Sequence, residues 1–409
     1  MGSAPPDGDP APPDGSLPAA ALASVGERGL GLYLHVPFCA RRCGYCDFNT
    51  YTAAELGPPG GPPGASQDTY AEAAVAEIRF ARSVLAGANG RPVDTVFLGG
   101  GTPTILPPEH LFRMLRAVDE ELGLAPGAEV TTEANPDSVT PAALDVLRRG
   151  GFNRISFGMQ SSVRHVLRLL DRTHDPDGVP RAVQWARDAG FEQVSLDLIY
   201  GTPGESLDDW RRSLESALAC GPDHVSAYAL IVEDGTALAR RVGRGDLPAP
   251  DDDDLADKYV LADEALTAAG LSWYELSNWA RDEAARCRHN LLYWRGGDWW
   301  GIGPGAHSHV GGVRFWNVRS PRAYAARIAA GVSPAEAREV LDEPTARMER
   351  ILLETRLVEG LPVAVLEEDG RSRLPELRAS GLVGPEPERV VLTRRGRLLA
   401  DAIVRDLVP

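Results

Sequence analysis

A chain of 409 residues is long enough for one large domain and a smaller one, and its 43% of apolar residues can fill a core. The formal net charge of −16 argues against nucleic acid as the main partner, because phosphate binding depends on an excess of lysine and arginine. The longest apolar runs are strand-sized and the first thirty residues lack the pattern of a signal peptide, so we expect a cytoplasmic protein without a membrane span.

The beginning of the chain combines two segments of low complexity with a cysteine-rich loop. Residues 1–29 form a tail rich in proline and glycine, which we expect to be disordered because it has little apolar surface to bury. Residues 56–66 have a similar composition and are predicted to be a flexible surface insertion. Between them, three of the five cysteines stand at the spacing C-x3-C-x2-C: Cys39, Cys43 and Cys46.

Six strand-like runs alternate with helix-periodic stretches between residues 30 and 245. The alternation predicts an α/β fold with parallel strands, arranged as an open sheet or a barrel. In such folds the functional residues follow the C-terminal ends of the strands. Polar or glycine-rich residues stand at these ends here, which a buried parallel strand does not need for packing: Cys39, Gly99 to Thr102, Glu133, Gln160 and Asp197.

The alternation ends near residue 245. Residues 246–330 are predicted to extend the barrel, beginning with four acids at 251–254 that favour the start of a helix and continuing into an aromatic-rich stretch. Residues 331–409 are predicted to form a C-terminal domain of helices and a β-wing, like a small winged helix.

The cysteine loop is one thiolate short of a closed zinc site or a fully ligated iron–sulfur cluster. A [4Fe–4S] cluster held by three cysteines leaves one iron open to a small chelating molecule. A structural zinc site completed by a distant histidine is the alternative interpretation.

The segment "YLHVPFCARRCGYC" resembles the cluster loop of the radical S-adenosylmethionine (SAM) superfamily, which has this cysteine spacing and an aromatic residue before the last cysteine. The resemblance implies a partial (β/α)6 TIM-like barrel, a [4Fe–4S] cluster on the three cysteines, and SAM that chelates the fourth iron through its amino and carboxylate groups. It also implies a set of residues around the cluster and SAM: Tyr33, Tyr45, Gly100, Gly101, Thr102, Glu133, Gln160, Arg172 and Asp197.

Further motifs, including "FLGGGTPT" and "DLIYGTPGES", resemble the oxygen-independent coproporphyrinogen III oxidase-like group. The oxidases of that group carry another cysteine two positions after the third, where this chain has Phe48, so the chain is most similar to the heme chaperones of the group. "HNLLYW" matches a signature that the resemblance associates with heme, with His289 as the ligand and Cys287 as the alternative. For His307 we leave open a place in the cavity or a structural role.

The resemblance implies a heme chaperone that binds an iron–sulfur cluster, SAM and heme. It would deliver heme to apoproteins such as respiratory hemoproteins, with transient contact at the inner membrane face. The alternative is an enzyme that decarboxylates coproporphyrinogen III, so enzymatic activity stays an open question. The sequence indicates no electron donor.

Overall fold

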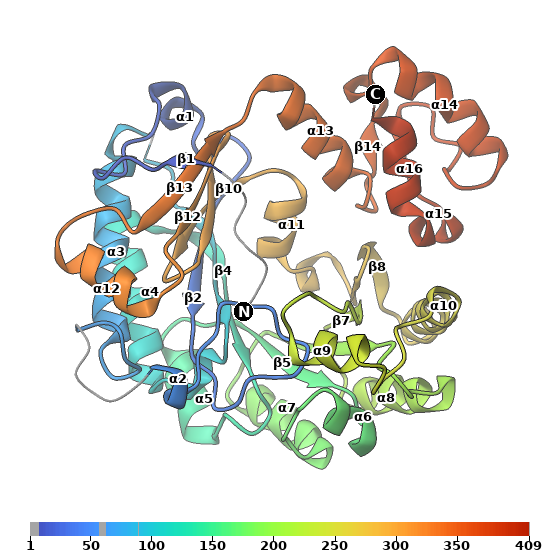
Figure 1. Ribbon diagram of the computed structural model, residues 1–409, viewed down its shortest axis with the longest axis horizontal. Coiled ribbons are helices and arrows are strands. Elements are labelled where there is room, and N and C mark those ends of the chain that lie inside the picture. The colour runs from blue at the N-terminus through green and yellow to red at the C-terminus, as the bar shows by residue number, and fades with distance from the viewer. Residues whose placement is uncertain (1–7, 57–62, 89, 409) are drawn as a thin grey trace.

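The computed structural model describes residues 8–56, 63–88 and 90–408. Six parallel strands, each followed by at least one helix, form the core of the fold (Figure 1). These strands are β2 (Leu30–Val36), β3 (Val93–Gly100), β4 (Leu124–Ala134), β5 (Arg154–Gln160), β6 (Gln193–Tyr200) and β7 (His224–Ala229). Neighbours in this series pair in parallel, which confirms the α/β fold expected from the alternation.

Helices cover the outer face of the parallel strands (Figure 1). They are α3 (Tyr70–Val84), α4 (Pro108–Leu122), α5 (Pro141–Arg149), α6 (Arg164–Leu169), α7 (Val179–Asp188), α8 (Leu207–Ala219) and α10 (Asp252–Ala268). Helix α9 (Ala237–Gly243) lies instead at the C-terminal ends of the strands, where Leu238 N donates to Gly44 O. Short α and 3-10 helices lie at α2 (Ala53–Leu56), Leu85–Gly87, Pro103–Ile105, Pro176–Gly178, Glu283–Ala285 and Val363–Val365. Because helices pack on their outer face, the strands are nearly continuously buried; in β2, for example, six of seven residues are buried.

Further strands extend both sides of the parallel set. On one side stand β10 (Asp298–Ile302), β11 (His307–Val310), β12 (Val313–Asn317), β13 (Ala335–Val340) and β1 (Asp9–Pro10), and on the other β9 (Asn278–Ala280) and β8 (Ser272–Glu275). Strand β10 pairs in parallel with β2, whereas the other added strands pair antiparallel. In the described residues the whole forms one thirteen-stranded sheet with the order β1-β13-β12-β11-β10-β2-β3-β4-β5-β6-β7-β9-β8.

Helix α11 (Arg288–Trp294) packs against β2, β3 and β10. Its residue His289 contacts Thr95, near the N-terminal end of β3. The helix therefore closes the floor of the barrel, opposite the strand ends that carry the cysteine loop.

The prediction of a disordered tail through residue 29 is wrong for residues 8–29. Strand β1 pairs with β13, and helix α1 (Ala19–Ser24) places Ala21 in the main core. Gly26 N donates a hydrogen bond to Asp298 Oδ2 at 2.7 Å. The few apolar residues of this segment are enough to order it, because they pack against a sheet that other parts of the chain form.

The predicted start of the C-terminal domain at residue 331 is too early, because β13 belongs to the main sheet. A separate hydrophobic cluster begins with Ile351 and continues to Leu407. It is built from α13 (Glu343–Glu354), α14 (Glu368–Ala379), α16 (Ala400–Leu407) and the strand pair β14 (Leu361–Pro362) and β15 (Arg389–Val390). The short helix α15 (Arg394–Leu398) lies between β15 and α16 in the sequence.

Two other expectations concern surface segments. Of the predicted insertion at residues 56–66, residues 57–62 lie outside the described residues. The acids at 251–254 begin α10 as expected, with the Asp251 side chain accepting from Asp254 N at 2.9 Å. Among the helices of the described ranges, none combines the length and the apolar character that crossing a bilayer requires.

A fully buried carboxyl, that of Glu77 on α3, joins the outer helix to the added strands. It accepts hydrogen bonds from Gly303 N (2.7 Å), Asn317 Nδ2 (2.7 Å) and Tyr324 Oη (2.6 Å). Burial raises the pKa of Glu77 to about 7. The three donors come from the segment after β10, from β12 and from α12 (Pro321–Ala329), so one side chain fastens three elements to α3.

We expect Glu77→Ala to lower the free energy of unfolding by at least about 2 kcal/mol, because it leaves three buried donors without an acceptor. Urea titration of the purified protein measures the change. The control is Glu72→Ala, an exposed acid on the same helix, which we expect to change stability by less than about 1 kcal/mol. Equal effects of the two substitutions would contradict the role given to Glu77.

Candidate functional site

The three clustered cysteines lie on the loop that follows β2. Cys39 N donates to Tyr51 O at 3.0 Å, which joins the two ends of the loop. In its middle, Gly44 N donates to Leu170 O (3.2 Å) and Gly44 O accepts from Leu238 N (2.8 Å). These bonds fix the loop to segments that follow β5 and β7, at the C-terminal ends of the strands.

The cysteine thiols are free and half-buried. Burial raises the pKa of Cys39 and raises the pKa of Cys46 to about 11, so metal binding at these sulfurs must release protons. Among the described residues, no three or more histidine, cysteine or acidic side chains are arranged around a single metal ion. An iron–sulfur cluster spreads its thiolate ligands over several irons and needs no such common point.

The glycine-rich end of β3 packs directly against the cysteine loop. Thr102 N donates to Phe38 O at 2.8 Å. A Cβ atom at Gly101 would overlap the Phe38 carbonyl, and one at Gly100, whose φ is +106°, would overlap the His35 ring. Only glycine allows this approach of the two backbones, which explains the run at Gly99 to Thr102 physically.

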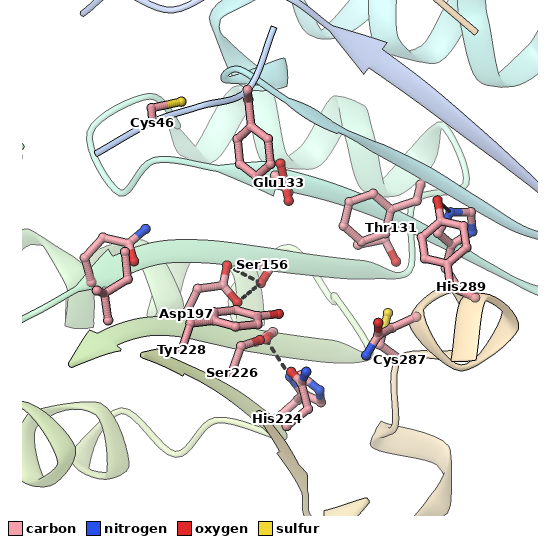
Figure 2. Close-up of a pocket in the computed structure, with 18 of the residues that line it drawn as sticks. Cys46, Thr131, Glu133, Ser156, Asp197, His224, Ser226, Tyr228, Cys287 and His289 are labelled. Carbon is pink, nitrogen blue, oxygen red and sulfur yellow. Dashed lines mark hydrogen bonds between the residues drawn. The ribbon is translucent and has the colours of Figure 1, made fainter. Parts of the chain in front are cut away.

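A cavity of about 480 Å³ lies inside the barrel, with the cysteine loop at one end. Figure 2 shows Cys46 at that end and Cys287 and His289 at the other, with Glu133 and Asp197 between them. The volume lies within the range of about 300–1,000 Å³ that is usual for small-molecule sites. We call this space the barrel cavity.

Two acids face the barrel cavity from β4 and β6. Ser156 Oγ donates to both carboxylate oxygens of Asp197, at 3.0 and 2.8 Å, and Gly100 N donates to Glu133 Oε2 at 3.1 Å. Loss of hydration inside the barrel raises the pKa of both acids, and the Asp197 charge helps to raise that of Glu133 to about 8. A cationic group placed between them would lower these values again, so the pair is suited to a positively charged ligand.

Three other residues from the sequence-based set also line the barrel cavity: Tyr33, Tyr45 and Gln160. Gln160 ends β5 with a φ of +59°, beside an irregularity in its pairing with β6. A left-handed conformation is uncommon for a residue other than glycine and often marks a functional position.

Thr102 and Arg172 line a different cavity, of about 330 Å³, together with Cys43. Arg172 Nη1 donates to Cys43 Sγ at 3.6 Å, and Nη2 donates to Asn135 Oδ1 (2.7 Å) and Gly158 O (2.8 Å). Its Nε atom is buried and has no hydrogen-bond partner in the described part of the chain. Because Cys46 lines the barrel cavity and Cys43 lines this one, the cysteine loop borders both.

His289 lies in the barrel floor, only 1% exposed. Its Nδ1 shares a hydrogen bond with Thr95 Oγ1 (2.8 Å) and its Nε2 one with Tyr293 Oη (2.7 Å). Burial lowers the pKa of His289 to about 3, so the ring stays neutral. The alternative ligand, Cys287, donates its thiol to Glu129 Oε1 at 3.6 Å, and burial raises its pKa to about 12.

The sequence reasoning missed several polar residues of the barrel cavity, because it took one polar residue from each strand and did not follow the same face along the strand. Alternate positions along a strand share a face, so polar residues spaced by two within apolar strands were the available signal. The missed residues that line the cavity are Thr131, Arg154, Ser156, Ser195, His224, Ser226 and Tyr228.

The raised pKa of Glu133 predicts a pH dependence of stability that Glu133→Gln removes. Unfolding returns the carboxyl to its ordinary pKa of 4.5, so between about pH 5 and 8 the folded state binds more protons than the unfolded state. The stability of the unsubstituted protein relative to the Gln variant therefore falls as the pH rises, by at most about 1.4 kcal/mol per pH unit.

Urea titrations at several pH values measure this difference. The control is Glu109→Gln, which removes an exposed acid on α4, outside the barrel cavity. If the stability difference between the unsubstituted protein and Glu133→Gln stayed constant from about pH 5 to 8, the Glu133 carboxyl would be ionised over this whole range and the prediction would be wrong.

Comparison with known proteins agrees with this geometry. The model of the radical SAM superfamily matches residues 33–217. The chain is 51% identical to the heme chaperone HemW of Mycobacterium tuberculosis, across 95% of this chain and 97% of that protein. It is 34% identical to the heme chaperone HemW of Escherichia coli, across 92% and 97% of the two chains.

Among solved structures, the coproporphyrinogen III oxidase HemN from Escherichia coli, described as a radical SAM enzyme, matches with a TM-score of 0.80 and 25% identity. The match covers 95% of this chain and 92% of that one. Its likeness extends over the barrel and the C-terminal elements together. The chain therefore belongs to the radical SAM superfamily and, within it, to the heme chaperone HemW family.

Proposed function

We propose that the protein is a heme chaperone that binds a [4Fe–4S] cluster, SAM and heme, and that it passes heme to apoproteins. The observation that carries the proposal is the joint presence of two features. The chain is 51% identical over nearly its full length to a curated heme chaperone. Three free thiols also stand on one loop, and one of them, Cys46, lines a cavity with two protonatable acids.

Cys39, Cys43 and Cys46 would hold the cluster. Three thiolates without a fourth protein ligand fit a cluster that keeps one iron open, and the close approach of Gly100 and Gly101 fixes the loop that carries them. When bound, the cluster would supply an electron to the sulfonium group of SAM. Arg172, whose Nη1 donates to Cys43 Sγ, would lie directly beside the cluster.

SAM would occupy the space beside the cysteine loop. Glu133 and Asp197 are placed to accept from the ammonium or from ribose hydroxyls. Arg172, whose buried Nε is unpaired within the described residues, would pair with the carboxylate. Thr102, Gln160, Tyr33 and Tyr45 would complete the surroundings, while Gly100 and Gly101 would act by allowing the cysteine loop to approach β3.

The role of the HNLLYW segment follows from its place in the barrel floor. His289 as the heme ligand would have to give up one of its two hydrogen bonds and leave a site that is 1% exposed. We propose that these bonds hold α11 in place, and that the segment meets heme through Tyr293, which lines two neighbouring cavities.

The apoprotein recipients would be hemoproteins such as respiratory enzymes. We propose delivery from the cytoplasm, with transient contact at the inner membrane face when the recipient is membrane-bound. Nucleic acid is not a proposed partner, because the net charge is −16.

Coproporphyrinogen III decarboxylation is the alternative, since HemN shares the fold. Phe48 stands where the group's oxidases carry a further cysteine, and its side chain is 62% exposed at the edge of the barrel cavity. A phenyl ring can neither ligate metal nor transfer a hydrogen atom as a thiol does. The curated relatives at 51% and 34% identity are heme chaperones, which favours the proposed function.

Cluster binding is tested by anaerobic reconstitution. We expect the protein to bind iron and sulfide in equal amounts and to lose both in Cys39→Ser, because only three cysteines hold the cluster. Cys220→Ser, which changes a cysteine after α8 away from the loop, should keep them. Iron and sulfide analysis measures the content. Zinc in place of iron and sulfide would overturn the cluster assignment.

Chaperone and oxidase functions are separated by product analysis on the reconstituted protein. Incubated with SAM, a reductant and coproporphyrinogen III, it should form no more protoporphyrinogen than Cys39→Ser does. In the same preparation, hemin added in excess should remain bound after gel filtration. Product formation that depends on Cys39 would establish the oxidase, and absence of bound hemin would refute the chaperone.

A further inference from the structure

A second large cavity, of about 540 Å³, adjoins the barrel cavity. The two cavities share four lining residues: Tyr33, Asp47, Phe48 and Tyr293. The second cavity reaches from the cysteine loop toward β11 and β12, where its wall includes His307, Trp316 and Arg319. We call it the side cavity.

Four histidines line the two cavities, and three of them have both ring nitrogens engaged. His289 bonds to Thr95 and Tyr293, and His35 shares hydrogen bonds with Tyr33 Oη (3.0 Å) and Asn49 O (2.9 Å).

The third engaged histidine is His224, bonded to Ser195 Oγ (2.8 Å) and Tyr274 Oη (2.9 Å). The fourth, His307, is exposed, and neither of its ring nitrogens forms a hydrogen bond to the described residues. Of the imidazoles facing these cavities, His307 is thus the one that could bind a metal without first losing a protein partner.

His307 has an aromatic neighbour. Its ring lies 5.9 Å from that of Trp316 and is inclined to it by 24°, in a stacked arrangement. Partial burial lowers the pKa of His307, and the charges of Arg319 and Arg314 act in the same direction. At neutral pH the imidazole is therefore uncharged, which is the form that ligates heme iron.

The remaining walls of the side cavity suit a flat apolar ligand with anionic groups. Tyr293 and Trp299 meet edge to face, with ring centroids 4.5 Å apart, and both line the cavity. Phe48, 62% exposed, adds an aromatic face at the border with the barrel cavity. Arg319 carries a guanidinium that can pair with a carboxylate, while Asp47 is the acid on this wall.

We propose that the side cavity is the heme site and that His307 is the axial ligand of the heme iron. Its imidazole nitrogen donates a lone pair to the iron and displaces a bound water, with no change of oxidation state. The macrocycle lies against Phe48, Tyr293 and Trp299, and Arg319 pairs with a propionate. The inference rests on the proposed function, and it places heme beside the cysteine loop instead of in the barrel floor.

Hemin binding to the reconstituted protein tests the assignment. We expect His307→Ala to weaken hemin binding by about tenfold or more and to abolish the imidazole-ligated signal in electron paramagnetic resonance. Added imidazole should restore that signal. Iron and sulfide content and circular dichroism should match those of the unsubstituted protein, because the His307 side chain makes no hydrogen bond within the described residues.

The matched control is His309→Ala, two residues further along β11. The His309 ring is bonded to Gly297 O at 2.9 Å, and we expect hemin affinity and signal to stay unchanged. If His307→Ala kept both the hemin affinity and the imidazole-ligated signal, the inference would be overturned and the proposed function would stand. Loss of that signal in His289→Ala would then identify His289 as the ligand. Failure of the unsubstituted protein to bind hemin would overturn both.

Discussion

The docking of the cysteine loop onto the end of β3 is the contact on which the site depends. It is a backbone-to-backbone contact, made at 2.8 Å between Thr102 N and Phe38 O, and it leaves no room for a Cβ atom at Gly101. Because peptide groups are less mobile than side chains, the contact fixes the thiols at the strand ends with little freedom. The same strip of glycines also orients Glu133 through the Gly100 amide.

Inside the barrel, polar groups are arranged in two layers with different functions. Near the floor, His289, Cys287 and His224 are fully paired by neighbouring side chains, which makes a rigid base. Nearer the cysteine loop, Glu133 and Asp197 carry raised pKa values in the free protein. A positively charged ligand that binds between them would lower these pKa values, so its binding is coupled to release of the Glu133 proton.

Sequence patterns predicted the six parallel strands well, because short strand-like runs alternate regularly with stretches of helical periodicity. The residues at the strand ends were also found in this way: Glu133, Gln160 and Asp197 all line the barrel cavity. The division of the predicted SAM residues between two cavities, with Arg172 beside Cys43, depends on how loops far apart in the chain meet. No local pattern contains that information.

The same limit explains the two wrong boundaries. Residues 8–29 look disordered by composition, yet they fold against a surface that other segments create. Strand β13 lies after a predicted boundary, but its pairing partner β12 lies before it. For His289, the motif indicated a ligand, and the structure adds the hydrogen-bond partners of its ring. These partners, Thr95 and Tyr293, lie 194 and 4 residues away in the sequence, and no local pattern indicates the first of them.

The pairing of β1 with β13 also covers one edge of the sheet. Edge strands expose unpaired backbone N–H and C=O groups with which other chains can pair, and natural proteins usually cover or shorten such strands. Here the cover comes from a segment whose composition suggests that it is dispensable. A chain trimmed to begin at residue 30 would uncover β13, where Val340 is already 57% exposed, and would lose the bond from Gly26 to Asp298. Self-association of such a shortened protein would then follow from its geometry rather than from any loss of the cofactor site.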